Sequence, residues 1–442
     1  MKKIDLTQGK VVSVLVALAL PIMASSVLQL TYNLVDMLLV GRLGSDAVAS
    51  IGTSSFLIGV ANAIQACIVF STGILVSHAI GRKDEEEQSK YLSTGFRLNL
   101  LFGLFFALFV IWIGKPFISF LNVQNEWVEL QGYAYLVVSS PMLIFSFFNF
   151  WYTRVFNSFG QNKMALKISA IGVVLNIMLD PLFIYTFKLG VLGAGLATLI
   201  ANVVMTLCFY IKSKQLFQLD LTAKYGVSTY LKMIRLGLPM SSQRLLFTLV
   251  SIFLAKMITS FGTEAIAAQK IGLQIESITY MVIGGLNGAI ASFVGQNYGA
   301  KNFNRIKEGV RVAIIIGLLY ALLTTVLFLV FPKSLARCFV TDRQTIEITA
   351  NYLRIVGLTQ VFMAIEIIFN GAFVGLGMPK IPATISIVFT AARIPMAWLF
   401  TQWMGVNGIW LSISVSMVLK GILAAYVYYK KGKEGIMDVA AI

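Results

Sequence analysis

The chain has 442 residues, of which 58% are hydrophobic and only 12% are charged, and its formal net charge is +16. Apolar stretches of about 20 or more residues recur from end to end, which excludes an ordinary soluble domain and predicts a polytopic helical membrane protein. The three cysteines have no paired spacing, so neither a disulfide framework nor a zinc site is predicted.

Apolar runs long enough for a helical span occur at twelve places along the chain. They are centred near Leu28, Ile64, Phe105, Leu143, Val174, Ala201, Val250, Met281, Leu319, Phe362, Ile387 and Ile413. The first run is too long for a signal peptide and lacks a small-residue cleavage site, so we expect no detachable leader. These runs predict an all-α fold with twelve transmembrane helices.

Basic residues gather in alternate connections between these runs. One set of connections is rich in Lys and Arg, whereas the opposite set holds only Arg42, Lys115, Lys188, Lys333, Arg337 and Arg343. Cytoplasmic loops are enriched in Lys and Arg, so we expect both termini in the cytoplasm and the protein in the inner (plasma) membrane of a bacterium. The same asymmetry explains much of the net charge, which indicates contact with anionic lipids rather than nucleic-acid binding.

Asp36 is the only acidic residue between Val11 and Val40 in the first apolar run. An ionised Asp near the centre of the bilayer costs about 2.5 to 3.5 kcal/mol on insertion scales and usually marks an ion or proton pathway. The alternative is an Asp at a helix end near the interface. Tyr32, one helical turn before Asp36, and its neighbour Asn33 are candidates for the wall of a substrate cavity, with interior packing as the alternative for Tyr32.

The fifth run carries a second set of polar groups. Asn176 and Asp180 are four residues apart and therefore share one face of a helix. Pro181 follows directly, and its ring excludes the carbonyl of Ile177 from normal helical bonding. In the sixth run, Thr198 lies four residues after Ala194, so its hydroxyl can bond the Ala194 carbonyl.

With Asp36, these residues offer carboxylate, amide, hydroxyl and backbone oxygens to one small hard cation such as Na+. The expected cation-binding set is Asp36, Asn176, Asp180, Ala194 and Thr198. The run of six N-terminal spans has no deep Lys or Arg to neutralise the two carboxylates, so a bound cation is the simplest partner. Protonation of the carboxylates would neutralise them as well. The structural alternative is that these polar groups only hold helices together.

The two halves of the chain repeat one another. At a shift of 218 positions, Leu20-Pro21 falls on Leu238-Pro239, and at a shift of 215 Gly190 falls on Gly405. Each copy has six spans, so the copies should be related by a pseudo-two-fold axis along the membrane normal. We predict an N-terminal six-helix lobe with the cation site over 1–211, a cytoplasmic linker over 212–232, and a C-terminal six-helix lobe over 233–442.

The second half lacks the acidic set. Asp36 maps to Leu254, Asn176 to Arg393 and Asp180 to Ala397, so we expect no equivalent cation site there. Gln243 and Glu366 are candidates for the substrate cavity of this half. Glu276 and Glu366 are expected to pair with neighbouring basic groups such as Lys270 or Arg393, and a role in substrate binding stays open.

Four segments of the chain resemble the multidrug and toxic compound extrusion (MATE) family. They are Pro21 to Gly44 with Asp36 and Gly41-Arg42-Leu43-Gly44, the loop Gly81-Arg82-Lys83-Asp84, the segment Asn176-Ile177-Met178-Leu179-Asp180-Pro181-Leu182, and Gly190 to Thr198. The resemblance covers essentially the whole chain. It implies two six-helix lobes, alternating access, and export of amphiphilic compounds driven by inward flow of sodium or protons. It also implies that the five residues named above form the cation site of the N-terminal lobe.

Other functional classes find less support. The sequence has no His-Glu-x-x-His motif, no Gly-rich nucleotide loop and no nucleophile constellation, so an enzyme is not expected. No cofactor beyond the transported Na+ or H+ and no obligate protein partner is expected. The main alternative is a lipid-linked oligosaccharide flippase of the same superfamily, and a non-transporting scaffold is a third possibility.

Overall fold

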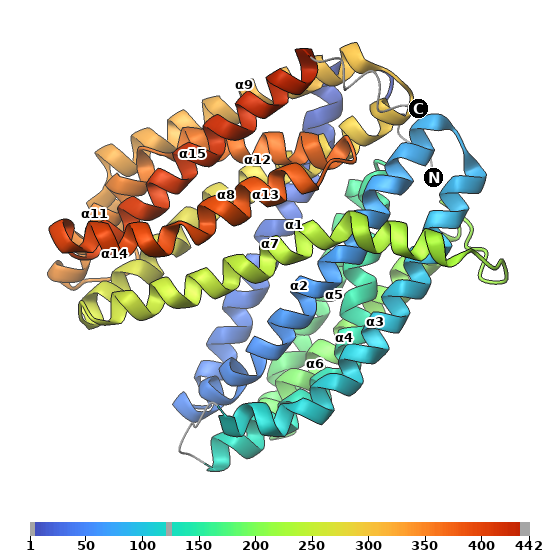
Figure 1. Cartoon of the computed structure of the whole chain (residues 1–442). Coiled ribbons are helices and arrows are strands. Elements are labelled where there is room, and N and C mark those ends of the chain that lie inside the picture. Colours follow the sequence, from blue (N-terminus) through green and yellow to red (C-terminus); the bar gives the residue numbers. More distant parts are fainter. Residues whose placement is uncertain (1–4, 121–125, 434–442) are drawn as a thin grey trace. The chain divides into compact units, whose positions relative to one another are not determined.

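The computed structural model describes residues 5–120 and 126–433, and within these ranges it contains helices and no strand (Figure 1). The helices of the first half are α1 Val11–Gly41, α2 Ser45–Arg82, α3 Glu85–Phe120, α4 Glu126–Ser158, α5 Asn162–Pro181, the π-helix η1 Leu182–Thr186, and α6 Gly190–Ser213. Those of the second half are α7 Val227–Thr259, α8 Thr263–Gly299, α9 Phe303–Val330, α10 Pro332–Arg337, α11 Arg343–Gly357, α12 Gln360–Gly375, α13 Lys380–Ala391, α14 Arg393–Met404 and α15 Val406–Lys433.

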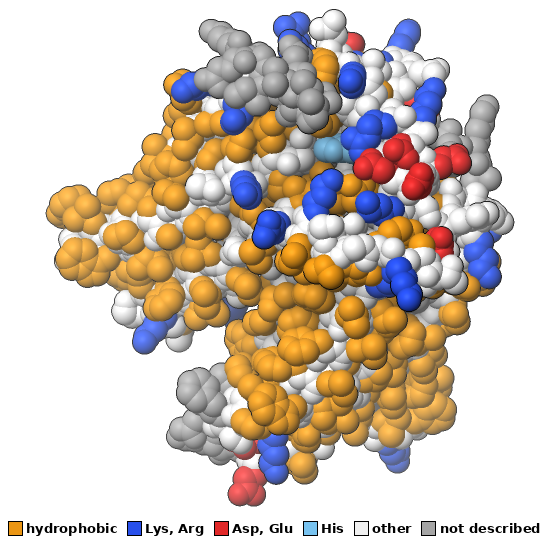
Figure 2. Space-filling view, turned by 45° about the vertical axis from the view of Figure 1, so that its right-hand side comes forward, with side chains coloured by type: hydrophobic (Ala, Val, Ile, Leu, Met, Phe, Trp, Pro, Cys, Tyr) orange, Lys and Arg blue, Asp and Glu red, His pale blue; other side chains and the backbone are white. Residues whose placement is uncertain are grey.

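The predicted all-α fold with twelve spans is confirmed. Eleven stretches of the described chain are long and apolar enough to cross a membrane, and α11 with α12 supplies a twelfth as a pair bent by 54°. Hydrophobic side chains cover much of the visible face of the molecule, as lipid contact requires (Figure 2). At the bend, the carbonyl of Val356 accepts from the backbone N–H of Thr359 over 3.0 Å and from the Thr359 hydroxyl over 2.9 Å.

The repeat extends to the backbone. Left-handed backbone angles recur at equivalent positions of the two halves, namely Gly44 and Gly262, Lys83 and Lys301, Gly160 and Gly377, and Gly190 and Gly405. Gly44 and Gly262 precede α2 and α8 with φ of 109° and 97°, a region that favours glycine because it has no Cβ. The two copies therefore share their turns as well as their spans.

The helices form two compact units, and each unit takes the beginning of one helix from the other half. Ala24–Ser241 belongs to the N-terminal unit, whereas Leu6–Met23 and the chain from Ser242 onward belong to the C-terminal unit. The first part of α1 packs in the C-terminal unit because Leu15 and Leu18 join a core with Leu286, Ile290 and Phe293. The bounds of these units therefore differ from the lobes 1–211 and 233–442.

The segment before α1 is held to the C-terminal unit through its backbone. The Arg305 guanidinium donates to the carbonyls of Leu6, Gln8 and Gly9 over 3.3, 2.6 and 2.8 Å. Asn297 Nδ2 donates to the Leu6 carbonyl as well, over 3.2 Å. Five donors in a rigid fork make Arg suited to gathering several carbonyls at once.

The segment before α7 is held to the N-terminal unit in a similar way. Arg97 on α3 donates to the Ala223 carbonyl over 2.6 Å and to the Tyr230 hydroxyl over 3.1 Å. Backbone N–H groups of Ala223 and Thr222, together with the Thr222 hydroxyl, hold the pKa of Asp220 below its usual range and close a turn in this linker.

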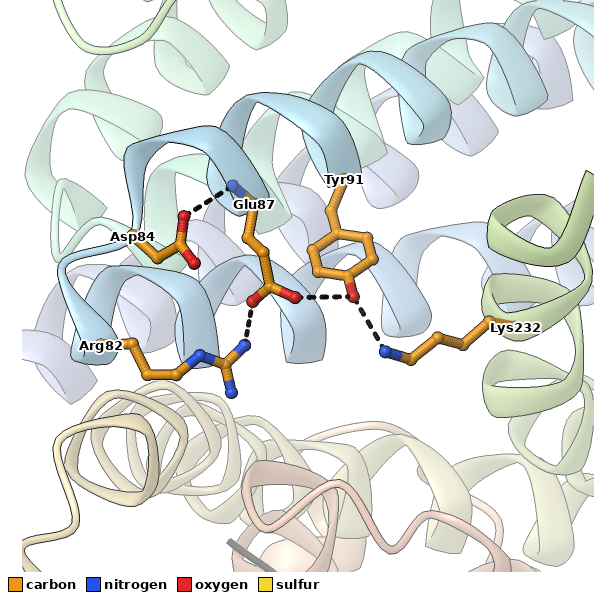
Figure 3. A network of polar contacts seen from close by, with 5 residues as sticks. All are labelled: Arg82, Asp84, Glu87, Tyr91 and Lys232. Carbon is orange, nitrogen blue, oxygen red and sulfur yellow. Dashed lines mark hydrogen bonds and ion pairs between the residues drawn. The ribbon is translucent and has the colours of Figure 1, made fainter. Parts of the chain in front are cut away.

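A polar network joins the first turns of α7 to the first turns of α3 and the end of α2 (Figure 3). Lys232 Nζ donates to the Tyr91 hydroxyl over 2.8 Å, and Tyr91 donates to Glu87 over 3.3 Å. Glu87 also pairs with Arg82, and its backbone N–H donates to Asp84 over 2.8 Å. The network fixes the start of α7 on the N-terminal unit.

Close packing of α7 on α2 leads to a prediction about Gly237. A Cβ at this position would lie 1.8 Å from the carbonyl oxygen of Cys67, so the two backbones must separate in Gly237→Ala. Overpacking of this kind typically costs about 1 to 3 kcal/mol. We expect a lower midpoint of thermal unfolding in detergent. The matched control is Gly59→Ala, where a Cβ would meet nothing within 4 Å; equal midpoints for the two variants would contradict the prediction.

Candidate cation site

The fifth span changes its helical geometry at the polar residues. α5 ends at Pro181, and the chain continues as the π-helix η1 over Leu182–Thr186. Pro181 has no N–H, so the usual bond to the carbonyl four residues earlier is lost, and a π-turn is a common accompaniment of functional sites. Asn176 and Asp180 lie just before this change with exposed fractions of 2% and 0%.

The side-chain amide of Asn176 bridges Asp180 and Thr198. In one orientation of the amide, Asn176 Nδ2 donates to Asp180 Oδ2 over 2.9 Å, and Asn176 Oδ1 accepts from the backbone N–H of Thr198 over 3.2 Å. The opposite orientation of the amide keeps both neighbours, with Nδ2 3.3 Å from Asp180 Oδ1 and 3.2 Å from Thr198 Oγ1. The bridge thus joins α5 to α6 in either orientation.

Small residues of α6 bring its polar groups close to η1. A Cβ on Gly193 would lie 2.7 Å from the Phe183 carbonyl, so only glycine permits this approach. The next residue is Ala194, whose carbonyl accepts from Thr198 Oγ1 over 2.9 Å. The spacing of four residues therefore produces the expected bond between these two groups.

The second half of α1 contributes Tyr32 and Asp36. The Tyr32 hydroxyl lies 3.5 Å from Thr198 Oγ1. Asp36 lies one helical turn after Tyr32, is partly buried, and makes no hydrogen bond or ion pair within the described residues. The Tyr185 hydroxyl donates to the Leu39 carbonyl over 2.5 Å and ties this end of α1 to η1.

The structure thus brings four of the five expected residues into one chain of hydrogen bonds. Asp36 is near this chain without a direct bond to it. Two carboxylates without a basic partner, an amide, a hydroxyl and a backbone carbonyl suit a sodium ion or a proton, because hard cations prefer oxygen ligands. Asn33 is exposed and accepts from Gln29 Nε2 over 3.3 Å, so no contact ties its side chain to the bridge.

Three nearby residues were not among the expected set. Tyr135 on α4 packs against Gly195, the residue that follows Ala194 on α6. Asn202 and Asn149 continue the polar contacts along α6 and α4. Asn202 follows Thr198 by four residues, a spacing that could have indicated it; nothing in the sequence pairs Asn149 or Tyr135 with the site.

The second half holds buried charges of a different kind. Lys420 Nζ lies 3.7 Å from Glu366 Oε1. Glu276 accepts from the Tyr352 hydroxyl over 2.6 Å and from Gln360 Nε2 over 3.4 Å. Glu366 therefore pairs with a basic group as expected, but that group is Lys420 and not Lys270 or Arg393, and no ion pair of Glu276 with either of them is found among the described residues. Glu366 lies on α12 and Lys420 on α15, so no local sequence pattern pairs the two residues.

The remaining candidates of this half do not form a site with Glu366. Arg393 Nε donates to Ser416 Oγ over 2.6 Å. Gln243 is half-buried, and no hydrogen bond in the described parts of the chain joins it to Glu366. Leu254 and Ala397, which align with Asp36 and Asp180, are 5% and 0% exposed and belong to an apolar core.

Known proteins resemble the chain over nearly its whole length. The family model MatE matches residues 21–182 and 239–399, one stretch in each half. The chain is 26% identical to the probable multidrug resistance protein YpnP of Bacillus subtilis (strain 168), with 98% of both chains covered. It is also 26% identical to the probable multidrug resistance protein NorM of Thermotoga maritima, with 95% of this chain and 92% of that protein covered.

Solved structures show the same fold. A mutant of the Vibrio cholerae MATE transporter VcmN superimposes with a TM-score of 0.91 at 23% identity, covering 97% of this chain and 98% of that one. A MOP superfamily transporter from Pyrococcus furiosus gives a TM-score of 0.90 at 23% identity, covering 98% of each chain. The two-lobe helical architecture is therefore shared with these transporters.

Proposed function

Because the chain belongs to the MatE family, we propose that it is a cation-coupled antiporter that exports amphiphilic, often cationic, compounds by alternating access. It is a multi-pass membrane protein of a transporter family and not an enzyme. The relatives named as multidrug resistance proteins support this class of small-molecule substrate.

One observation carries the coupling proposal. Asp180 is fully buried and bridged through Asn176 to Thr198, Tyr32 brings the segment of α1 that carries Asp36 to Thr198, and neither carboxylate makes an ion pair among the residues that the structure describes. A buried carboxylate without a basic partner is costly unless a cation or a proton neutralises it. The oxygens at this site therefore support alternate binding of Na+ or H+.

The cycle follows from this competition for oxygens. In the outward-facing state, a cation enters at Asp36 and Asp180, moves the second half of α1 through Tyr32 and Asp36, and releases the drug. The loaded protein then returns inward. One charge crossing the membrane supplies about 2.3 kcal/mol per 100 mV, enough to sustain a substantial gradient of substrate. Coupling needs only the N-terminal unit, since Leu254 and Ala397 replace the two carboxylates in the other half.

The setting of the transporter is part of the same proposal. We place it in the plasma membrane of a bacterium with both termini in the cytoplasm, because Lys and Arg gather in the connections on that side. Anionic lipid headgroups are the expected neighbours of these basic residues.

Reconstituted protein in liposomes tests the function. Uptake of a fluorescent amphiphilic cation is measured after imposing a sodium gradient, a pH gradient, or neither, with protein-free liposomes as the control. We expect either gradient to drive transport. If the rate of transport is the same with and without the sodium and pH gradients, the coupling mechanism is wrong. If the protein moves a lipid-linked oligosaccharide and does not transport the drug, a flippase is favoured.

A further inference from the structure

A second polar cluster continues the candidate cation site along α6. Thr198, Asn202 and Thr206 follow one another at intervals of four residues and so lie on one face of the helix. α4 packs directly against α6 and supplies Asn149, which is only 4% exposed. We call Asn149, Asn202 and Thr206 the α4–α6 knot.

The α4–α6 knot forms hydrogen bonds with the backbone of α6 next to the candidate cation site. Asn202 Nδ2 donates to the carbonyl of Thr198 over 2.9 Å. Asn149 Nδ2 donates to both oxygens of Asn202, over 2.9 Å to Oδ1 and 3.1 Å to the carbonyl. Thr206 Oγ1 lies 2.9 Å from both Asn149 Oδ1 and the Asn202 carbonyl and shares its one hydrogen between these acceptors. An unbroken series of bonds therefore runs from Asp180 through Asn176, Thr198 and Asn202 to α4.

The place where these bonds end matters more than their contribution to helix packing. Polar contacts between membrane helices contribute about 0.6 kcal/mol on average, so their contribution to the packing of α4 on α6 is modest. Here the bonds end on the turn from Ala194 to Thr198, which carries two of the expected cation ligands. Ligand oxygens bind a cation well only when outer partners hold them at the right separation.

We propose that Asn149, Asn202 and Thr206 are positioning residues that set the sodium affinity and the ion selectivity of the site. They do so by fixing the turn of α6 that presents the Ala194 carbonyl and the Thr198 hydroxyl. Sodium needs several oxygens at defined distances, and lithium, being smaller, fits a different spacing. Loosening the turn therefore weakens sodium binding and changes the preference between the two ions. This inference rests on the proposed function of the site.

The test uses purified full-length protein reconstituted in liposomes, with transport of the fluorescent cation measured against sodium or lithium concentration. The variants are Asn202→Ala, Asn149→Ala and the near-isosteric Thr206→Val, which keeps the packing volume if the Asn variants fold poorly. We expect the half-saturating sodium concentration to rise by about 10-fold, which is the smaller of the losses in metal affinity that follow when a residue supporting a metal ligand is removed. The ratio of the sodium to the lithium value should change, with transport at saturating sodium retained.

Asn99→Ala is the matched control. Asn99 is a fully buried amide on α3 that accepts from Gln65 on α2 over 3.2 Å and has no bond to the knot or to Asp180. A purely structural role predicts equal loss of transport in the control and the knot variants, with an unchanged ion ratio, and that result would overturn the inference. Asp180→Asn separates the two proposals: if it keeps the sodium dependence, or if the wild-type protein has none, the site itself is wrong and the knot inference fails with it.

Discussion

Asp180→Asn is expected to abolish cation-driven export. The substitution keeps the size of the side chain and an oxygen that can accept from Asn176, so the bridge between α5 and α6 survives. It removes the buried negative charge that attracts the cation. Removing a residue that only supports a metal ligand typically lowers the metal affinity by about 10- to 100-fold. Removing the charge of a ligand itself should therefore weaken sodium coupling by more than about 100-fold.

Transport of a fluorescent cation by reconstituted protein provides the measurement. Asp46→Asn is the control, because Asp46 is an exposed carboxylate at the start of α2 in the same unit and its removal should leave transport unchanged. Asp36→Asn should resemble Asp180→Asn. If both variants keep full dependence on sodium and on the pH gradient, the proposed site does not couple transport.

Glu366→Met is expected to destabilise the C-terminal unit strongly. Lys420 would stay at 4% exposure without the carboxylate that now lies 3.7 Å away, so its amino group must either keep an unpaired charge or give up its proton, and both are costly. Breaking a buried ion pair by removing one partner typically costs about 3 to 5 kcal/mol, whereas replacing both partners by apolar groups is often neutral. The double variant Glu366→Met/Lys420→Met should therefore recover most of the loss in a thermal unfolding measurement in detergent.

The double variant also separates the two roles left open for Glu366. If it unfolds like the wild type and transports normally, the pair is structural. If it is stable but no longer transports, Glu366 or Lys420 takes part in handling the substrate. A single variant as stable as the wild type would show that Lys420 has another acidic or polar partner, contrary to the contacts described.

The spans and the core of the candidate site follow from local sequence. Each span is a long apolar run, and the spacing of four residues places Asn176 with Asp180 and Ala194 with Thr198 wherever the helices lie. Pro181 disrupts α5 by its own chemistry, as the π-helix after it shows. The repeat was visible as well, because its turns depend on glycines at equivalent positions.

Only the tertiary structure decided which distant residues meet. The partner of Glu366 is Lys420 rather than Lys270 or Arg393, Asn149 joins Asn202 from another helix, and the beginning of α1 packs in the C-terminal unit. Helical periodicity is a property of neighbouring residues and is written in the sequence by hydropathy and spacing. Contacts between helices depend on the rotation, depth and bend of each one, which are set by the packing of all their side chains together.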